Sequence, residues 1–307
     1  MIKKVFTYDD VYLHPRYSEL PTRKNADTSV TFLGKNFKLP VVPANMEDVI
    51  DLGLTQWMSQ QHYFYIMHRF GEFGDLRKYS LPSENSSMSV GVGDTAKKYL
   101  DELGDDLPVF VTIDVAHAHH DNVKDMVKFI RSLENSTKLI VGNIATADGY
   151  KFLCDLGVDA VKVGVGGGSI CTTRFETGFH LPTAYSVWEC AQTNSDVPII
   201  ADGGIKHRGD IAKALVLGAD MVMCGGLFAS CIDSPAKIIH GKKIYRGSTS
   251  YEAKGNHNHV EGKTIEIDEG ITYEQQMWKI RDSLSSSISY AGGTNLSAFN
   301  NVEWSLL

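Results

Sequence analysis

The chain has 307 residues, a formal net charge of −7 and 43% hydrophobic residues. These values are ordinary for a globular protein and exclude a disordered or fibrous chain. They also argue against nucleic acid as a partner, because a phosphate backbone requires a basic surface and the sequence holds no long run of Lys and Arg.

The first part of the chain lacks the pattern of a targeting segment. Asp9 and Asp10 turn it acidic before the apolar core of a signal peptide can form. No uninterrupted apolar run reaches about 18 residues, the length that crosses a bilayer. We therefore predict a cytoplasmic protein without a membrane partner, in which residues 1–38 precede the first strand.

Short apolar runs alternate with longer amphipathic stretches from residue 41 onward. The runs are continuous, as expected for strands of a parallel sheet that is buried on both faces. They predict strands at 41–44, 64–67, 88–90, 109–114, 139–142, 160–163, 199–202 and 221–223. Helical spacing of apolar residues predicts helices at 96–103, 122–133, 147–156, 184–192 and 208–217, and a last helix at about 273–286.

Eight strands with intervening helices favour an α/β fold of the (β/α)8 TIM-barrel type, with an open doubly wound sheet as the alternative. An internal repeat favours the barrel, because 156–164 and 217–225 share the pattern Leu-Gly-x-Asp-x-Val-x-x-Gly. The polar stretch at about 232–270 does not fit the alternation and is typical of an active-site flap or a disordered segment. We predict one barrel domain over residues 1–307 with this flap near its C-terminal end.

The densest chemical signal is Gly164-Val-Gly-Gly-Gly-Ser-Ile-Cys-Thr-Thr-Arg174, which follows the sixth predicted strand. Active sites of barrels form at this end of the strands. Glycines leave backbone N–H and C=O groups accessible to an anion or a cation. Cys171 lies among hydroxyls and near Arg174, which is typical of a nucleophilic thiol, although a glycine-rich turn with an incidental cysteine is the alternative.

Two further glycine pairs follow the last two predicted strands, in Asp202-Gly-Gly204 and Cys224-Gly-Gly226. Glycines on these two loops form the common phosphate site of barrels, and Asp202 suits a pair of ribose hydroxyls. The alternative is two tight turns. The five cysteines are odd in number and form no Cys-x-x-Cys pair, so we expect neither a disulfide framework nor a zinc ribbon. The histidines at 117–120 and 257–259 lack metal-site spacing.

Together these motifs resemble the IMP dehydrogenase/GMP reductase family, and more closely its bacterial-type reductase branch. The resemblance covers nearly the whole chain. It is carried by Tyr8-Asp-Asp-Val-Tyr-Leu13, Leu39-Pro-Val-Val-Pro-Ala-Asn-Met46, Ile113-Asp-Val-Ala116, Val141-Gly-Asn143, Gly168-Ser-Ile-Cys-Thr-Thr-Arg174, Ala201-Asp-Gly-Gly-Ile205 and Ser289-Tyr-Ala-Gly-Gly293.

The resemblance implies a TIM barrel, a homotetramer and attack of Cys171 on C2 of the purine of a nucleoside monophosphate. It implies that the ribose lies at Asp202. The other substrate-binding residues that it implies are Ser169, Gly203, Gly204, Gly225, Gly226, Gly247, Ser248, Thr249 and Gly262. It also implies a potassium-type ion held by the backbone carbonyls of Gly166, Gly168 and Arg174.

The flap favours the reductase reaction over the dehydrogenase reaction. IMP dehydrogenases usually carry an inserted regulatory CBS domain, for which this chain has no room, and an Arg-Tyr pair, which residues 246–270 lack. Instead, Val260-Glu-Gly-Lys-Thr264 is similar to the reductase flap. We therefore expect conversion of GMP and NADPH to IMP, ammonia and NADP+, with Thr173 and Glu261 moving protons. An IMP dehydrogenase without its regulatory domain is the alternative.

Cofactor contacts also follow from the resemblance. The matched positions are Thr22, Arg23, His68, Arg69, Asp114, Val115, Ala116, Val165, Gly166, Ser286 and Ser287. Two positions depart from the family pattern, because Gly167 replaces a usual Pro and Asn258 replaces an Arg of many reductases. A flavin-dependent barrel enzyme and an inactive nucleotide-binding protein are more distant alternatives, which the motif around Cys171 disfavours.

Overall fold

The computed structural model describes residues 3–70, 85–133, 136–193, 195–251 and 260–307. Its centre is a curled parallel sheet of seven strands in the order β4-β10-β9-β8-β7-β6-β5. These strands are β4 (Val41–Pro43), β5 (Ser87–Val90), β6 (Phe110–Asp114), β7 (Lys138–Ile144), β8 (Ala160–Val163), β9 (Ile199–Asp202) and β10 (Met221–Cys224). The pairing of β10 with β4 joins the last strand to the first, which confirms the TIM-barrel prediction.

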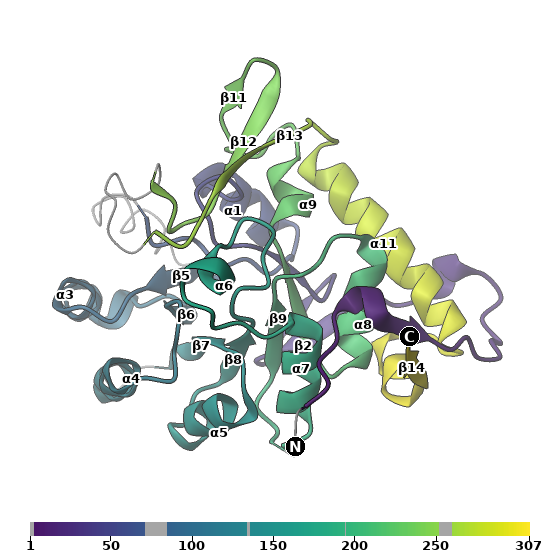
Figure 1. The fold of residues 1–307 in the computed structure, drawn as a ribbon, viewed down its shortest axis with the longest axis horizontal. Helices are drawn as coiled ribbons and strands as arrows, with labels where there is room; N and C mark the ends of the chain where they lie inside the picture. The colour runs from purple at the N-terminus through teal and green to yellow at the C-terminus, as the bar shows by residue number, and fades with distance from the viewer. Residues whose placement is uncertain (1–2, 71–84, 134–135, 194, 252–259) are drawn as a thin grey trace.

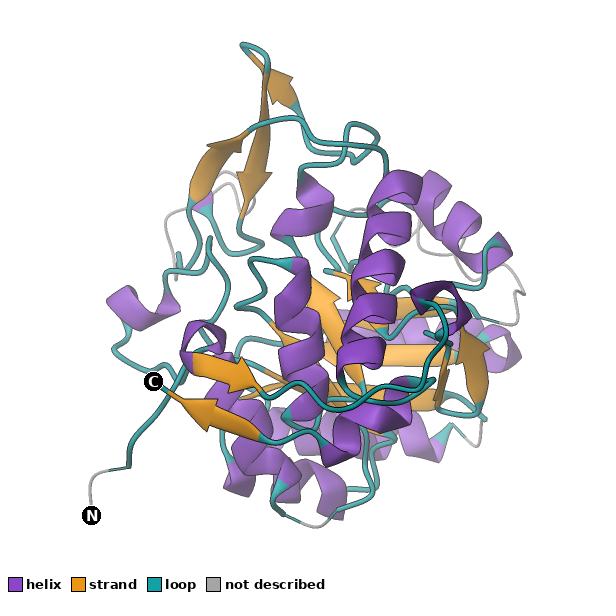
Figure 2. Ribbon diagram, turned by 90° about the vertical axis from the view of Figure 1, so that its right-hand side faces the viewer, coloured by secondary structure: helices purple, strands orange, loops and turns teal. Residues whose placement is uncertain are grey.

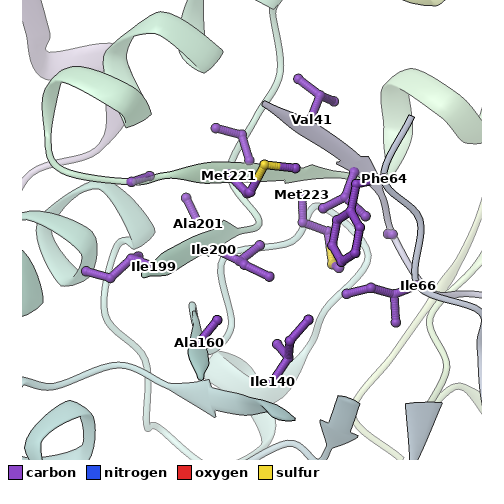
Figure 3. Close-up of a cluster of buried hydrophobic side chains, with 14 of the residues drawn as sticks. Val41, Phe64, Ile66, Ile140, Ala160, Ile199, Ile200, Ala201, Met221 and Met223 are labelled. Atoms are coloured by element: carbon purple, nitrogen blue, oxygen red, sulfur yellow. The ribbon is translucent and has the colours of Figure 1, made fainter. Parts of the chain in front are cut away.

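The predicted strand at 64–67 is mostly wrong. Of its residues, Met67 alone forms a bridge, to Met88 of β5. Phe64 is nevertheless fully buried, with its ring 5.2 Å from that of Phe32 and 5.3 Å from that of Phe110. Packing of side chains therefore holds this eighth segment in place, where the sequence pattern suggested a full ladder of backbone hydrogen bonds. Figure 3 shows Phe64 beside Met223 in the barrel core.

Helices surround the sheet, as Figure 1 shows. They are α1 (Leu52–Gln60), α3 (Asp94–Leu103), α4 (Asp121–Ser132), α5 (Ala147–Asp155), α7 (Thr183–Ala191), α8 (Arg208–Val216) and the long α11 (Tyr273–Tyr290). Two short helices, α6 (Thr173–Glu176) and α9 (Gly226–Ala229), follow β8 and β10. The internal repeat is also present in three dimensions. Gly157 and Gly218 adopt φ of +74° and +107° and end α5 and α8 before the next strand.

The N- and C-terminal segments pair outside the barrel. Strand β1 (Val11–Leu13) runs antiparallel to β14 (Trp304–Leu306), as Figure 2 shows. Strands β2 (Val30–Phe32) and β3 (Lys35–Phe37) form a hairpin. Short 3-10 helices at Tyr8–Asp10, Arg23–Asn25 and Leu296–Asn301 belong to these terminal regions, and another, at Gly104–Asp106, follows α3 in the barrel. Within the described ranges, no helix is long and apolar enough to cross a membrane.

The predicted flap is built on a small antiparallel sheet. It consists of β11 (Ile238–Ile239), β12 (Lys242–Arg246) and β13 (Thr264–Ile267). This sheet projects from the barrel in Figures 1 and 2. Residues 252–259, including Asn258 and the histidines at 257 and 259, lie outside the described residues. The hydrogen bonds of β12 with β13 fix where the described ends of the flap enter the site.

Candidate active site

A cavity of about 720 Å³ lies at the carboxyl ends of the barrel strands. The loops after β8, β9 and β10 form most of its wall, and the described flap residues close one side. All ten predicted substrate-binding residues line it, namely Ser169, Asp202, Gly203, Gly204, Gly225, Gly226, Gly247, Ser248, Thr249 and Gly262. The structure therefore brings this predicted group together around one space of nucleotide size.

Two glycines show why the loops can meet so closely here. Gly164 has φ of +150°, and a Cβ at this position would lie 1.9 Å from the carbonyl oxygen of Asp202. A Cβ at Gly225 would lie 2.1 Å from the hydroxyl of Tyr245. A side chain at either position would displace a cavity wall. Glycine is therefore favoured by packing at both positions, and at Gly164 also by the backbone conformation.

Cys171, Thr173 and Glu261 form a hydrogen-bonded chain. The Sγ of Cys171 lies 3.1 Å from the Oγ1 of Thr173, and that hydroxyl donates to the Oε2 of Glu261 at 2.6 Å. A threonine hydroxyl has one proton and an ionised carboxylate only accepts, so the Thr173 oxygen is left to accept from the thiol. The arrangement can carry a proton between Cys171 and Glu261.

Backbone hydrogen bonds connect the flap to the loop that carries Cys171 and Thr173. The amide of Thr172 donates to the carbonyl of Glu261 at 2.7 Å, and the amide of Lys263 donates to the carbonyl of Ile170 at 2.9 Å. These bonds form an antiparallel bridge between Cys171 and Gly262. They place Glu261 beside Thr173, although the two residues are far apart in the sequence.

A second cavity, of about 210 Å³, adjoins the first. Cys171, Asp202 and Glu261 line both. Six of the predicted cofactor residues line the smaller cavity, namely Arg69, Asp114, Val115, Ala116, Val165 and Gly166. The Nε of Arg69 is buried, lies 4.0 Å from Asp114 Oδ2 and has no hydrogen-bond partner among the described residues.

The other predicted cofactor residues lie apart from this site. The guanidinium of Arg23 lies against α11, 3.3 Å from the hydroxyl of Ser286, and over the ring of Tyr290. None of Thr22, Arg23, His68, Ser286 and Ser287 lines either cavity. His68 is buried, and its Nδ1 accepts a hydrogen bond from the amide of Phe70 at 3.2 Å. Burial lowers the pKa of His68.

Three residues without a predicted role also contribute to the site. Lys162 of β8, Asn143 of β7 and Tyr245 of β12 all line a cavity. The Nδ2 of Asn143 donates to Asp202 Oδ2 at 2.8 Å and so orients that carboxylate. A lysine within an apolar strand was the available signal, since lysine is almost never fully buried unless it is paired.

The positions predicted for a potassium-type ion lie on the wall of the larger cavity. Gly166, Gly168 and Arg174 line it, and the carbonyl of Gly168 accepts from the amide of Cys171 at 3.2 Å. Across the described part of the chain, no group of three or more His, Cys, Asp or Glu side chains is arranged to hold a metal ion. His117 and His119 have ring centroids 6.4 Å apart without such a group.

Known proteins are similar to this chain over almost its whole length. Residues 83–302 match the family model of the IMP dehydrogenase / GMP reductase domain. The GMP reductase of Staphylococcus carnosus is 41% identical over 98% of this chain and 96% of its own length. The GMP reductases of Lactobacillus gasseri and Streptococcus pyogenes serotype M3 are 41% and 42% identical, each over 98% of this chain and 94% of their own length. The barrel, the cysteine loop and these similarities together mean that the chain belongs to the IMP dehydrogenase/GMP reductase family.

Proposed function

We propose that this protein is an oxidoreductase that converts GMP, NADPH and two protons to IMP, an ammonium ion and NADP+. The observation that carries the proposal is the Cys171–Thr173–Glu261 chain, which lies where the two cavities meet. The similarity to proteins named GMP reductases supports it. The larger cavity would hold GMP, with its phosphate at the glycine loops and its ribose at Asp202.

Cys171 would act as the nucleophile. Its thiol proton passes through Thr173 toward Glu261, and the sulfur adds to C2 of the guanine ring. The C2–N bond to the amino group then breaks, which leaves the purine bonded to Cys171 through C2. Forming this covalent intermediate divides a difficult substitution into two easier steps.

Thr173 and Glu261 would supply protons in the first half of the reaction. The amino group must be protonated to leave as ammonia, and Glu261 holds the proton that came from Cys171. A positioned carboxyl that returns this proton acts as a general acid. In the second half, Cys171 leaves C2 as a thiolate and is stabilised by the hydroxyl of Thr173.

The smaller cavity fits the nicotinamide end of the cofactor. Its volume of about 210 Å³ is too small for a whole dinucleotide, and its wall offers the guanidinium of Arg69 and the carboxylate of Asp114. When bound there, NADPH supplies the hydride that C2 receives. Asp114 and Arg69 would orient the cofactor, while the shared wall at Cys171 would keep it next to the substrate.

We further propose that the protein is a cytoplasmic homotetramer in which residues 1–307 of each subunit form one barrel domain. Because Arg23 and Ser286 lie outside both cavities of their own chain, their predicted part in cofactor binding would concern a cofactor of a neighbouring subunit. A potassium-type ion at the carbonyls of Gly166, Gly168 and Arg174 would hold the cysteine loop in shape. Gel filtration and activity with and without K+ test these two points.

The test of the reaction is a spectrophotometric assay with purified protein. NADPH absorbance is followed after addition of GMP, and ammonia is measured in parallel. Loss of NADPH with an equal amount of ammonia is expected. No loss with GMP, but appearance of NADH from IMP and NAD+, would show a dehydrogenase in place of a reductase.

A further inference from the structure

Lys162 lies between two carboxylates in the centre of the barrel. Its side chain is 2% exposed, and its Nζ lies 2.8 Å from Asp114 Oδ1 and 3.1 Å from Asp202 Oδ2. Asp114 ends β6 and Asp202 ends β9, while Lys162 comes from β8. One ammonium group therefore joins residues of three strands.

The two carboxylates take different places in the site. Asp202 lines both cavities, whereas Asp114 lines the smaller one, where Arg69 lies 4.0 Å from its second oxygen. Arg69, Asp114, Lys162 and Asp202 thus alternate in charge from one cavity to the other. The amide of Asn143 completes the array at Asp202, to which it donates at 2.8 Å.

Lys162 and Asp114 are held in their charged forms by their neighbours in the array. Burial works against the charge of Lys162, but Asp114 and Asp202 outweigh it and raise the pKa of the lysine. Burial also works against the charge of Asp114, but Lys162, Arg69 and a hydrogen bond from Asn45 outweigh it and lower its pKa. The other titratable groups near Asp202 are Tyr8, Tyr245 and Cys224, and burial raises the pKa of all three so that they stay neutral.

We propose that Lys162 is a positioning residue that holds the carboxylates of Asp202 and Asp114 in one charge-balanced array across both cavities. This inference rests on the proposed function, since it takes Asp202 as the acceptor of the GMP ribose hydroxyls. Lys162 itself is too deeply buried to act as a proton donor to the reacting ring. Its effect is to balance the charge of both acceptors and to fix the direction of their oxygens.

Replacing Lys162 with methionine tests this role, because the length of the side chain is kept and the charge is lost. Two carboxylates would then face each other with no ammonium group between them, and their mutual repulsion would favour uptake of a proton by one of them as the pH falls. Asp202 would accept hydrogen bonds less well as the pH falls. We expect Lys162→Met to bind GMP at least ten-fold more weakly than the wild type at pH 6.5. The ratio of the variant's Kd to the wild-type Kd should become smaller toward pH 8.5.

The measurement is calorimetric titration of GMP without cofactor, so that no turnover occurs. The GMP phosphate titrates equally in both measurements, so its effect on Kd cancels when the Kd of the variant is divided by that of the wild type. Lys243→Met is the matched control. Lys243 is 1% exposed, and its Nζ donates to the carbonyl and hydroxyl of Ser234 and pairs with no carboxylate among the described residues. The ratio for this control is expected to be independent of pH.

Two companion variants separate charge from packing. Lys162→Arg keeps the charge and is expected to give a ratio that does not vary with pH. The double variant Lys162→Met/Asp114→Asn leaves a single carboxylate and should lose the pH dependence of the single variant. If Lys162→Met does not fold, the double variant is expected to fold, because the unpaired charge has been removed.

Several results would overturn the proposal. One is a ratio of variant to wild-type Kd that does not change with pH for Lys162→Met. Another is a ratio for Lys243→Met, or for the double variant, that changes with pH as it does for Lys162→Met. A third is failure of both Lys162→Met and the double variant to fold. Wild-type protein that binds GMP without oxidising NADPH would refute the proposed reaction and leave this test valid. Wild-type protein that does not bind GMP would refute both.

Discussion

Replacing Thr173 with valine should interrupt the proton path without emptying the space. Valine keeps the volume of the side chain and removes the hydroxyl, which lies 3.1 Å from Cys171 Sγ and 2.6 Å from Glu261 Oε2. Proton transfer by a positioned side chain contributes about 10²- to 10⁴-fold to rate, which corresponds to roughly 2.7–5.4 kcal/mol of transition-state free energy. We therefore expect kcat to fall by at least about 100-fold.

The same substitution should change stability and substrate affinity little. All three side chains are partly exposed, so loss of the hydrogen bond to Glu261 should cost about 1 kcal/mol of unfolding free energy. Single-turnover kinetics with saturating GMP and NADPH measure the chemical step, and calorimetry measures GMP binding.

Neighbouring and conservative variants complete this test. Thr172→Val is the control, because the hydroxyl of Thr172 makes no cap to α6 and this residue lines neither cavity. Thr173→Ser should keep most of the rate. The reasoning fails if Thr172→Val slows the reaction as much as Thr173→Val, or if GMP affinity falls as far as kcat.

Three further predictions concern single residues. Cys171→Ser should reduce turnover by at least about 10³-fold and leave GMP affinity within about three-fold; equal losses of both would contradict the nucleophile assignment. A Cβ at Gly167 would lie 2.2 Å from Thr183 Oγ1, so Gly167→Ala should cost about 1–3 kcal/mol in thermal unfolding. Gly167→Ala/Thr183→Ala should recover most of it, and no recovery would exclude this clash. Asp159 accepts from Arg131 Nη2 at 2.6 Å, and although burial works against its charge, Arg131 and other donors keep its pKa below the ordinary value. Such a carboxylate stabilises the fold above its unfolded-state pKa and loses this effect as pH falls through its folded-state pKa. Asp159→Asn should therefore lower the unfolding free energy measured in urea by about 1 kcal/mol at pH 7 and by much less below pH 4. An equal loss at both pH values would contradict this reasoning.

Local patterns sufficed to predict most of the barrel. Continuous apolar runs and helix-ending glycines such as Gly157 and Gly218 act within a few residues of their own position, so they can be recognised in a sequence. The segment at 64–67 shows the limit of such patterns. Its apolar residues are buried as expected, but whether they form a ladder depends on how the flanking strands approach, which no local pattern contains.

In the candidate active site, too, some features follow from the local sequence and others from the tertiary structure alone. Cys171, Thr173 and the glycines around them lie in one loop, so the sequence by itself determined that a thiol, a hydroxyl and unobstructed glycine backbone are neighbours. The tertiary structure alone decided that Glu261 hydrogen-bonds to Thr173, because backbone bonds between flap and loop create that contact. It alone also decided that Lys162 joins Asp114 to Asp202, while Arg23 lies far from both cavities. The physical reason is that charge pairing depends on distances of a few ångströms, and these are set by strand order and register once the barrel has closed.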